Sequence, residues 1–387
     1  MEQGRIESGA AHRAEAALPC VRLAPANQPG TWPSPHSWDD LARDAADPNP
    51  FFERWFLVPG LNHLGASSGA QLLCCELDGT LIGLVPICRQ NAYYGHPFPN
   101  VSAWLHDNAF CGTPLVRRGL EVPFWRAVLD WTDRNAGLSL FLHLPHLPAD
   151  GRVYAALCDV VGGTGRAAAV VQRSERAMLH AQMTPDEYFT ASMSAKKRKE
   201  LRRQHTRLSE LGTLHFSRET GGDRVSEWID AYLALEAKGW KGADGSALAQ
   251  HATNAALFTE ALAGAARLGL LERLTLTLDD RPIAMLANFH TAPGAYSFKT
   301  AYDEDYARFS PGVLLQRENL DLLTLAGIDW TDSCASADHP MIERIWREKR
   351  TITRVSVAIG GPVRQALAAG IFRAERGSPL TSDTQEQ

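Results

Sequence analysis

Residues 77–85 read LDGTLIGLV, and residues 278–286 read LDDRPIAML. In both segments an apolar stretch ends at an acidic turn and a second apolar stretch begins directly after it, which is the pattern of a β-hairpin. The two copies start 201 positions apart (278 minus 77), close to the length of one domain. The pair indicates two related domains, although hairpins are common enough for such a similarity to arise without duplication.

Helix and strand patterns alternate around the second hairpin. Ser194 is a suitable helix N-cap and Gly212 a suitable stop for the helix between them. The elements predicted for this half are, in chain order, a helix at 194–211, a strand at 214–216, helices at 223–237 and 254–268, strands at 271–278, 283–290 and 295–302, a helix at 311–325, and strands at 328–332 and 353–359. This alternation predicts an α/β fold.

Length and composition narrow the class of protein. A chain of 387 residues fits two domains, and 45% hydrophobic with 21% charged residues is typical of a globular protein. The formal net charge of −5 gives no overall positive field, so nucleic acid would need a local basic patch. We predict a flexible tail at 1–27, domains at 28–180 and 181–375, and a second tail at 376–387.

Membrane and secretion signals are not recognised in the sequence. No segment approaches the roughly 20 continuous apolar residues of a membrane span, and the polar start lacks the apolar core of a secretory signal. The seven cysteines include the pair Cys74-Cys75 but no C-x-x-C, so neither a disulfide framework nor a metal site is predicted. These features favour a reducing cytoplasm.

A helix start at residues 310–312 is a candidate anion site. Ser310 suits an N-cap, Pro311 the first helical position, and Gly312 leaves room for a ligand. The backbone N–H groups of Gly312, Val313 and Leu314 and the positive helix end would hold a pyrophosphate, with Arg308 supplying charge. The alternative is an ordinary capped helix.

Six short motifs follow one another in a characteristic order. They are DPNPFF (47–52), LIGLVP (81–86), SAKKRK (194–199), EAKGWKG (236–242), KTAYD (299–303) and SPG (310–312). Together they resemble the two-domain GNAT proteins known as CelD-like or BioF-like acetyltransferases, relatives of the bacterial FemAB peptidoglycan enzymes. The resemblance covers about residues 47–359.

The resemblance implies two tandem GNAT-like domains, each a mixed, mostly antiparallel sheet flanked by helices. The second domain would bind acyl-CoA as a co-substrate rather than as a permanent cofactor, and no metal is implied. In GNAT folds the pantetheine arm pairs with the backbone where two strands splay apart, here expected between 283–290 and 295–302. The usual phosphate signature Q/R-x-x-G-x-G/A is absent, and only Arg308 and Gly312 echo it.

Acyl transfer to an amine needs a base, because the nucleophile must be neutral. Glu236 is the first candidate, since its helical face is apolar and such a setting would make it a stronger base. The alternative is a helix-end carboxylate paired with Lys238 or Lys241. Tyr302 is a candidate acid for the leaving thiolate.

Further candidates follow the strand at 328–332, at the sheet edge where α/β folds gather ligands. Asp332 and His339 are predicted as catalytic, because histidine titrates near neutral pH, although a histidine before a proline is more often a turn residue. Nothing marks Cys334 as an activated nucleophile. Residues predicted to bind substrate or order the loop around it are Trp240, Lys241, Lys299 and Asp303.

The predicted helix at 194–211 carries the densest positive charge in the chain. Its cations would hold the CoA 3′-phosphate or a tRNA backbone, or else form a solvated face. The leading prediction is an N-acyltransferase that acts from acyl-CoA, most simply acetyl-CoA, on a small-molecule or glycan-precursor amine. The alternatives are a FemAB-like transferase that uses aminoacyl-tRNA and a non-catalytic accessory protein of polysaccharide assembly.

Overall fold

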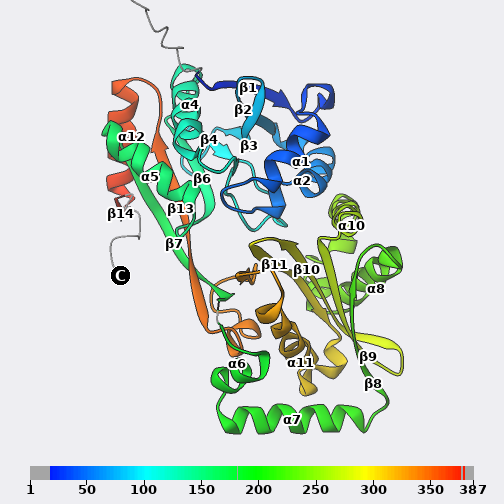
Figure 1. The fold of residues 1–387 in the computed structure, drawn as a ribbon. Coiled ribbons are helices and arrows are strands. Elements are labelled where there is room, and N and C mark those ends of the chain that lie inside the picture. The colour runs from blue at the N-terminus through cyan, green and yellow to red at the C-terminus, as the bar shows by residue number, and fades with distance from the viewer. Residues whose placement is uncertain (1–17, 181, 376–377, 380–387) are drawn as a thin grey trace, which may run out of the picture.

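The computed structural model describes residues 18–180, 182–375 and 378–379, and its strands join into one 14-stranded sheet (Figure 1). The N-terminal half contributes β1 (Cys20–Pro25), β2 (Gln71–Leu77), β3 (Thr80–Gln90), β4 (Asn100–Ala103), the short β5 (Leu115–Val116) and β6 (Phe141–Pro148). The C-terminal half contributes β8 (Leu214–Thr220), β9 (Leu271–Leu278), β10 (Arg281–Thr291), β11 (Gly294–Tyr302) and β12 (Trp330–Asp332). Between the two sets lie β7 (Ala168–Leu179) and β13 (Glu348–Ala358), and β14 (Ser378–Pro379) pairs with β7.

The two halves repeat one strand order. The path β1-β2-β3-β4-β6 in the first half corresponds to β8-β9-β10-β11-β12 in the second. In each path only the last pair is parallel, and it spans three residues: 100–102 with 141–143, and 294–296 with 330–332. Both hairpin turns, at 78–79 and 279–280, have positive φ at both central residues, as a type I′ turn requires. The predicted mixed, mostly antiparallel sheet in two related halves is therefore confirmed.

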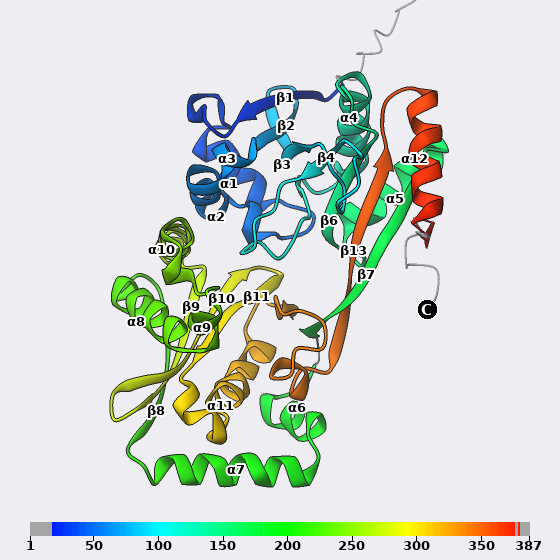
Figure 2. The ribbon, with the colours of Figure 1, turned by 180° about the vertical axis from the view of Figure 1, so that it is seen from behind.

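The halves exchange their last strands. β7 follows the N-terminal half in the chain, but its residues Met178 and Leu179 pair with β12. β13 follows the C-terminal half, but it pairs with β6 on one side and with β7 on the other. The two exchanged strands cross between the halves as a long antiparallel ribbon (Figure 2). Each half of the sheet therefore depends on a strand from the other half of the chain.

Two predicted boundaries are corrected by this arrangement. The segment 348–375 returns to the N-terminal half, because β13 pairs with β6 and α12 (Pro362–Ala374) packs on β7 and β13. The predicted tail at 1–27 is wrong from Cys20 onward, because β1 pairs with β2 along its whole length. Residues 1–17 and most of the predicted tail at 376–387 lie outside the described residues.

Helices cover both halves of the sheet. In the N-terminal half, α4 (Glu121–Arg134), α5 (Arg152–Thr164) and α12 lie on one side, at the right in Figure 2. α1 (Pro35–Arg43), α2 (Arg54–Gly60) and the short α3 (Ala66–Ser68) lie on the opposite side, where α2 contacts the C-terminal half. In the C-terminal half, α8 (Val225–Lys238), α9 (Trp240–Asp244) and α10 (Ala252–Arg267) lie on one face, and α11 (Pro311–Glu318) lies on the other. The helices α6 (Pro185–Ser192) and α7 (Ala195–Ser209) close the far end.

The predicted helices of the C-terminal half are largely confirmed. α7, α8 and α10 begin and end within a few residues of the predicted bounds, and Ser194 caps α7 through its side chain. The helix predicted at 311–325 ends earlier, because α11 stops at Glu318 and a 3₁₀ turn follows. At that point the buried Asn319 side chain accepts a hydrogen bond from Asn288 (2.7 Å) and donates one to Ser297. Tertiary hydrogen bonding thus favours a change of backbone geometry at Asn319.

The two halves meet at an aromatic cluster. The Phe56 ring centroid lies 5.7 Å from that of Phe298 on β11 and 6.1 Å from that of Phe289 on β10. Nearby, the Tyr296 hydroxyl donates to the Pro48 carbonyl at 2.8 Å. Pro48 belongs to the DPNPFF motif, so this motif contributes to the junction between the halves. Within the described part of the chain, no helix combines the length and apolarity needed to cross a membrane.

Candidate active site

A β-bulge in β11 decides which side chains face the junction between the halves. The register of β10 and β11 pairs Ala287 with Lys299 and Asn288 with Ser297, so Phe298 is an extra residue on β11. Regular alternation would place Lys299 on the same face as Ser297. Instead the Lys299 ammonium lies 5.5 Å from the Phe298 ring centroid and 5.6 Å from that of Phe110. The bulge therefore turns Lys299 toward the N-terminal half.

The strands that separate are β11 and β12, and not β10 and β11 as the sequence predicted. β10 and β11 pair from Ala284 with Tyr302 to Thr291 with Gly294, so they do not splay. β11 and β12 pair only at residues 294–296 with 330–332. Beyond Tyr296 no strand of the described chain pairs with this edge of β11, which leaves residues 297–302 open on the side away from β10. The predicted splay is thus corrected to β11 and β12.

Lys299 has an environment suited to proton transfer. Burial, reinforced by the nearby charge of Lys241, lowers the pKa of Lys299 to about 8, while Glu236 acts in the opposite direction. A lysine in this range is neutral in a substantial fraction of molecules near physiological pH and can accept a proton. The sequence analysis placed Lys299 only among the substrate-binding residues.

Glu236, the predicted general base, is buried at the end of α8. One of its carboxylate oxygens accepts from Lys241 Nζ at 2.7 Å, and the other accepts from the backbone N–H of Leu248 at 2.9 Å. This is the ion-paired carboxylate that the sequence left open as an alternative, with Lys241 as the partner. Both carboxylate oxygens are engaged by the protein, so the contacts of Glu236 fit a role in positioning Lys241.

The turn that carries Lys241 depends on its glycine. A Cβ on Gly242 would lie 1.8 Å from the Ala237 carbonyl oxygen, so only glycine allows this close approach. The preceding residue, Trp240, is 57% exposed, and its backbone N–H donates to Glu304 at 2.7 Å. The structure therefore brings Glu236, Lys241 and Lys299 together and leaves the Trp240 ring at the surface.

Asp303 follows β11 and organises the loop before α11. Its buried carboxylate accepts from Lys238 Nζ at 2.8 Å, from Arg281 at 3.2 Å, and from the backbone N–H of Asp305. These bonds agree with the predicted loop-ordering role. They leave the carboxylate engaged with the protein on three sides.

A groove of about 240 Å³ lies at the start of α11. Residues that line this α11 groove include Tyr302, Ser310, Gly312, Met341 and Arg344. A Cβ on Gly312 would lie 2.5 Å from the Met341 sulfur and 3.3 Å from the Tyr302 ring, so these two side chains pack directly against the glycine. A groove therefore lies beside residues 310–312, but the position directly over Gly312 is filled by the protein.

The hydrogen bonding at this helix start differs from the prediction in two respects. Ser310 has a left-handed backbone (φ 55°, ψ 50°) and makes no side-chain cap, and its carbonyl accepts from both Val313 and Leu314 at 3.0 Å. Of the three predicted amide donors, these two are already used and Gly312 remains. Arg308 is exposed and stacks on Phe309 at 4.7 Å rather than lining the groove. The arginine at the groove is Arg344, which the sequence did not single out.

A second groove, of about 270 Å³, adjoins the first and reaches the basic helix. The two share Ser310, Val313 and Arg344, and the second also includes Lys197 of α7. Cations of α7 that form no ion pair within the described residues are Lys196, Lys197, Arg198, Lys199, Arg202 and Arg207. The α11 groove thus continues toward an exposed positive helix.

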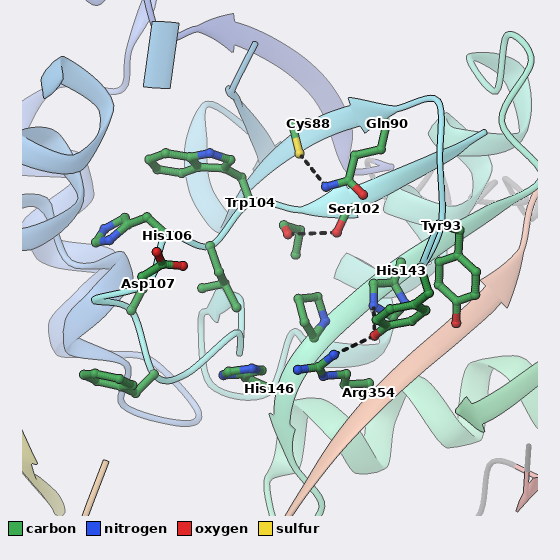
Figure 3. A pocket seen from close by; sticks show the side chains of 16 residues that line it. Cys88, Gln90, Tyr93, Ser102, Trp104, His106, Asp107, His143, His146 and Arg354 are labelled. Carbon is green, nitrogen blue, oxygen red and sulfur yellow. Dashed lines mark hydrogen bonds between the residues drawn. The ribbon is translucent and has the colours of Figure 1, made fainter. Parts of the chain in front are cut away.

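The N-terminal half holds a larger cavity of about 530 Å³ at the equivalent splay, between β4 and β6 (Figure 3). Its wall includes Arg354 from β13 and three histidines, His106, His143 and His146. Burial lowers the pKa of His106 and His146 to about 4 and that of His143 to about 3, so all three are neutral near pH 7. We call this space the N-terminal cavity.

The N-terminal cavity and Lys299 share a wall. Phe110 lines the cavity, and its ring lies under the Lys299 ammonium. The cavity of one half therefore ends beside the titrating lysine of the other half. No sequence signal pointed to this cavity, because its lining comes from segments spread between Cys88 and Arg354.

Asp332, which was predicted to be catalytic, lies between two buried arginines. It is buried, with Arg176 of β7 at 3.4 Å, Arg350 of β13 at 3.6 Å, and the backbone N–H of Cys334 donating at 2.8 Å. These contacts tie β12 to the two exchanged strands. The carboxylate has no contact with the grooves or the N-terminal cavity, so its surroundings fit a structural role.

His339 and Cys334 lie beyond β12. Burial and the charge of Lys241 lower the pKa of His339, and its Nδ1 lies 3.5 Å from the backbone nitrogen of Ile342, as in a turn residue. Burial raises the pKa of Cys334 well above its ordinary value, which disfavours a reactive thiolate. The roles assigned to Tyr302 and His339 stay predictions.

Comparison with known proteins agrees with this architecture. Residues 195–339 match the model of the acetyltransferase (GNAT) domain. The solved structure of FemX shares the fold, with a TM-score of 0.58 and 10% identity over 87% of this chain and 99% of that one. A conserved protein of unknown function from Bacteroides thetaiotaomicron has a TM-score of 0.52 and 12% identity over 84% of this chain and 98% of that one.

A further structural match is the C-terminal DUF2156 domain of an Agrobacterium fabrum protein named as a lysylphosphatidylglycerol synthetase. It has a TM-score of 0.50 and 12% identity over 90% of this chain and 98% of that one. No curated protein matches the sequence.

Proposed function

We propose that this chain, whose residues 195–339 match the model of the acetyltransferase (GNAT) domain, is an acyltransferase that moves an acyl group from a CoA thioester to an amine. The observation that carries the proposal is the open edge of β11, which runs from the α11 groove at Tyr302 to Lys299. Three residues of strand separate these two points, or about 10 Å.

The donor would enter through the α11 groove. A CoA diphosphate carries negative charge, and the groove offers the Gly312 amide, the start of α11 and the Arg344 guanidinium. The adjoining groove leads to Lys197, which suits a further phosphate. The pantetheine arm would follow the open edge of β11 and bring its thioester to the bulge at Phe298.

The acceptor amine would approach from the N-terminal cavity. Neutral Lys299 would take a proton from the acceptor ammonium, and the freed amine would attack the thioester carbonyl. The resulting oxyanion would form beside the Lys299 ammonium, which stabilises negative charge. When the C–S bond breaks, the proton would pass from Lys299 to the thiolate, and the second proton lost by the attacking nitrogen would pass to solvent. The products are an amide and free CoA, and Lys299 is neutral again.

Replacement of Arg344 tests the donor path. We expect Arg344→Gln to weaken acetyl-CoA binding roughly tenfold, because it removes a charge-assisted contact to phosphate. Isothermal titration calorimetry measures the change. Arg308→Gln is the matched control, because it removes the same charge from an exposed arginine outside the groove. The donor path is wrong if the two variants bind alike, and the CoA proposal fails if the folded wild-type protein binds no acetyl-CoA.

An aminoacyl-tRNA donor is a second candidate, favoured by the α7 cations that lack ion pairs. If α7 holds a tRNA backbone, replacing Lys196, Lys199 and Arg202 by Gln should lower tRNA affinity at low salt. It should also reduce the slope of log affinity against log salt by roughly three, one for each lost phosphate contact. Filter binding at a series of salt concentrations measures both. An unchanged slope would exclude this role for α7.

A further inference from the structure

The N-terminal cavity carries opposite charges on two parts of its wall. Arg354 of β13 lies beside His143, and Asp107 lies beside His106 on the loop after β4 (Figure 3). The histidines are neutral, so these two residues are the charged groups that line the cavity. Neither Arg354 nor Asp107 forms an ion pair with another residue of the described chain. The two charges are therefore available to a ligand.

At one end of the N-terminal cavity, Tyr94 holds the Arg354 side chain in place. The guanidinium donates to the Tyr94 hydroxyl at 2.8 Å, and that hydroxyl lies 3.4 Å from His143 Nε2. Tyr94 has a positive φ of 46°, a backbone conformation that is unfavourable for a bulky residue. In this conformation the Tyr94 side chain lines the cavity. His143 is fixed in turn by Ser356, at 3.0 Å from its Nδ1. One guanidinium nitrogen is thus engaged, and the others suit an oxyanion.

The Asp107 end lies toward the transfer site. Phe110, three residues further along the same loop, lines the cavity and has the Lys299 ammonium 5.6 Å from its ring centroid. A carboxylate at this end favours a positively charged group, such as an ammonium.

We propose that the acceptor is an amine that also carries an oxyanion, phosphate or carboxylate, held by Arg354 while its amino group lies at Asp107 beside Lys299. This inference rests on the proposed function and deepens it by giving the chemical class of the acceptor. A single molecule that carries both groups would satisfy both charges of the cavity at once.

Binding of a series of ω-aminoalkyl phosphates of increasing length tests the proposal without any reaction. The reporter is the ¹H–¹³C signal of His143 Cε1, identified by its loss in His143→Gln. We expect at least one length to bind roughly tenfold or more tightly than the alkyl phosphate of the same length. Asp107→Asn should remove that gain, and Arg354→Gln should weaken both series. A parallel series of ω-amino carboxylates shows whether phosphate or carboxylate is preferred.

Arg308→Gln is the matched control, because it removes an exposed arginine that lines neither the N-terminal cavity nor the two grooves, and it should leave these titrations unchanged. The proposal is overturned if no length in either series gains from its amine, or if Arg354→Gln binds as wild type does. Acetyl-CoA binding is measured separately on the same samples. Its loss alone would refute the donor, whereas loss of the amine gain alone would refute the acceptor class.

Discussion

Replacing Lys299 by glutamine is expected to lower kcat/KM for acyl transfer by about 10²–10⁴-fold, the range typical of a lost general base. The side chain at the bulge would no longer accept the acceptor proton or face the developing oxyanion. Steady-state kinetics with acetyl-CoA and a single amine measure the loss. Acetyl-CoA affinity should stay nearly unchanged, because the α11 groove is intact. Lys299→Arg should not restore activity, since a guanidinium stays protonated.

The pH profile separates a proton-transfer role from a purely structural one. Because the pKa of Lys299 is lowered to about 8, the active neutral form is the minority at pH 7 and the majority at pH 9. The wild-type rate should therefore rise through pH 8 and level off above it, and Lys299→Gln should lose that inflection. If the variant keeps the inflection, the titration belongs to the acceptor amine, and Lys299 is not the base.

Asp332→Ala is expected to lower the free energy of unfolding by about 3–5 kcal/mol, because it leaves two buried arginines without their shared carboxylate. Urea unfolding followed by tryptophan fluorescence measures the change. Asp150→Ala is the control, since Asp150 also pairs with Arg350 but is 53% exposed, and a pair of this kind contributes about 0–1 kcal/mol.

The two roles of Asp332 predict opposite results. If Asp332→Ala keeps wild-type stability but loses activity, the catalytic assignment made from the sequence holds. If stability falls while the residual folded protein retains turnover, the carboxylate serves the junction of β7, β12 and β13. The location at the strand exchange explains the large expected effect, because a residue there stabilises both halves at once.

The candidate site could be predicted only in part. The EAKGWKG and KTAYD motifs contain Glu236, Lys241 and Lys299, which the structure places near one another, and each motif could be recognised because it occupies one short segment. The position of Arg344, 32 residues after Gly312, could not be inferred, since it reaches the groove through an irregular segment. The histidines of the N-terminal cavity could not be predicted for a similar reason. Burial lowers their pKa, and this burial arises only when the halves assemble.

The sequence by itself determined the local elements: hairpins with acidic type I′ turns, the Ser194-capped basic helix, and the repeated order that predicts two related halves. These follow from preferences that act within a few residues along the chain. Only the tertiary structure decided that β7 and β13 cross between the halves, because the partners of both strands are far away along the chain. It also decided that Lys299 faces the junction, because a one-residue bulge reverses the side of every residue after it.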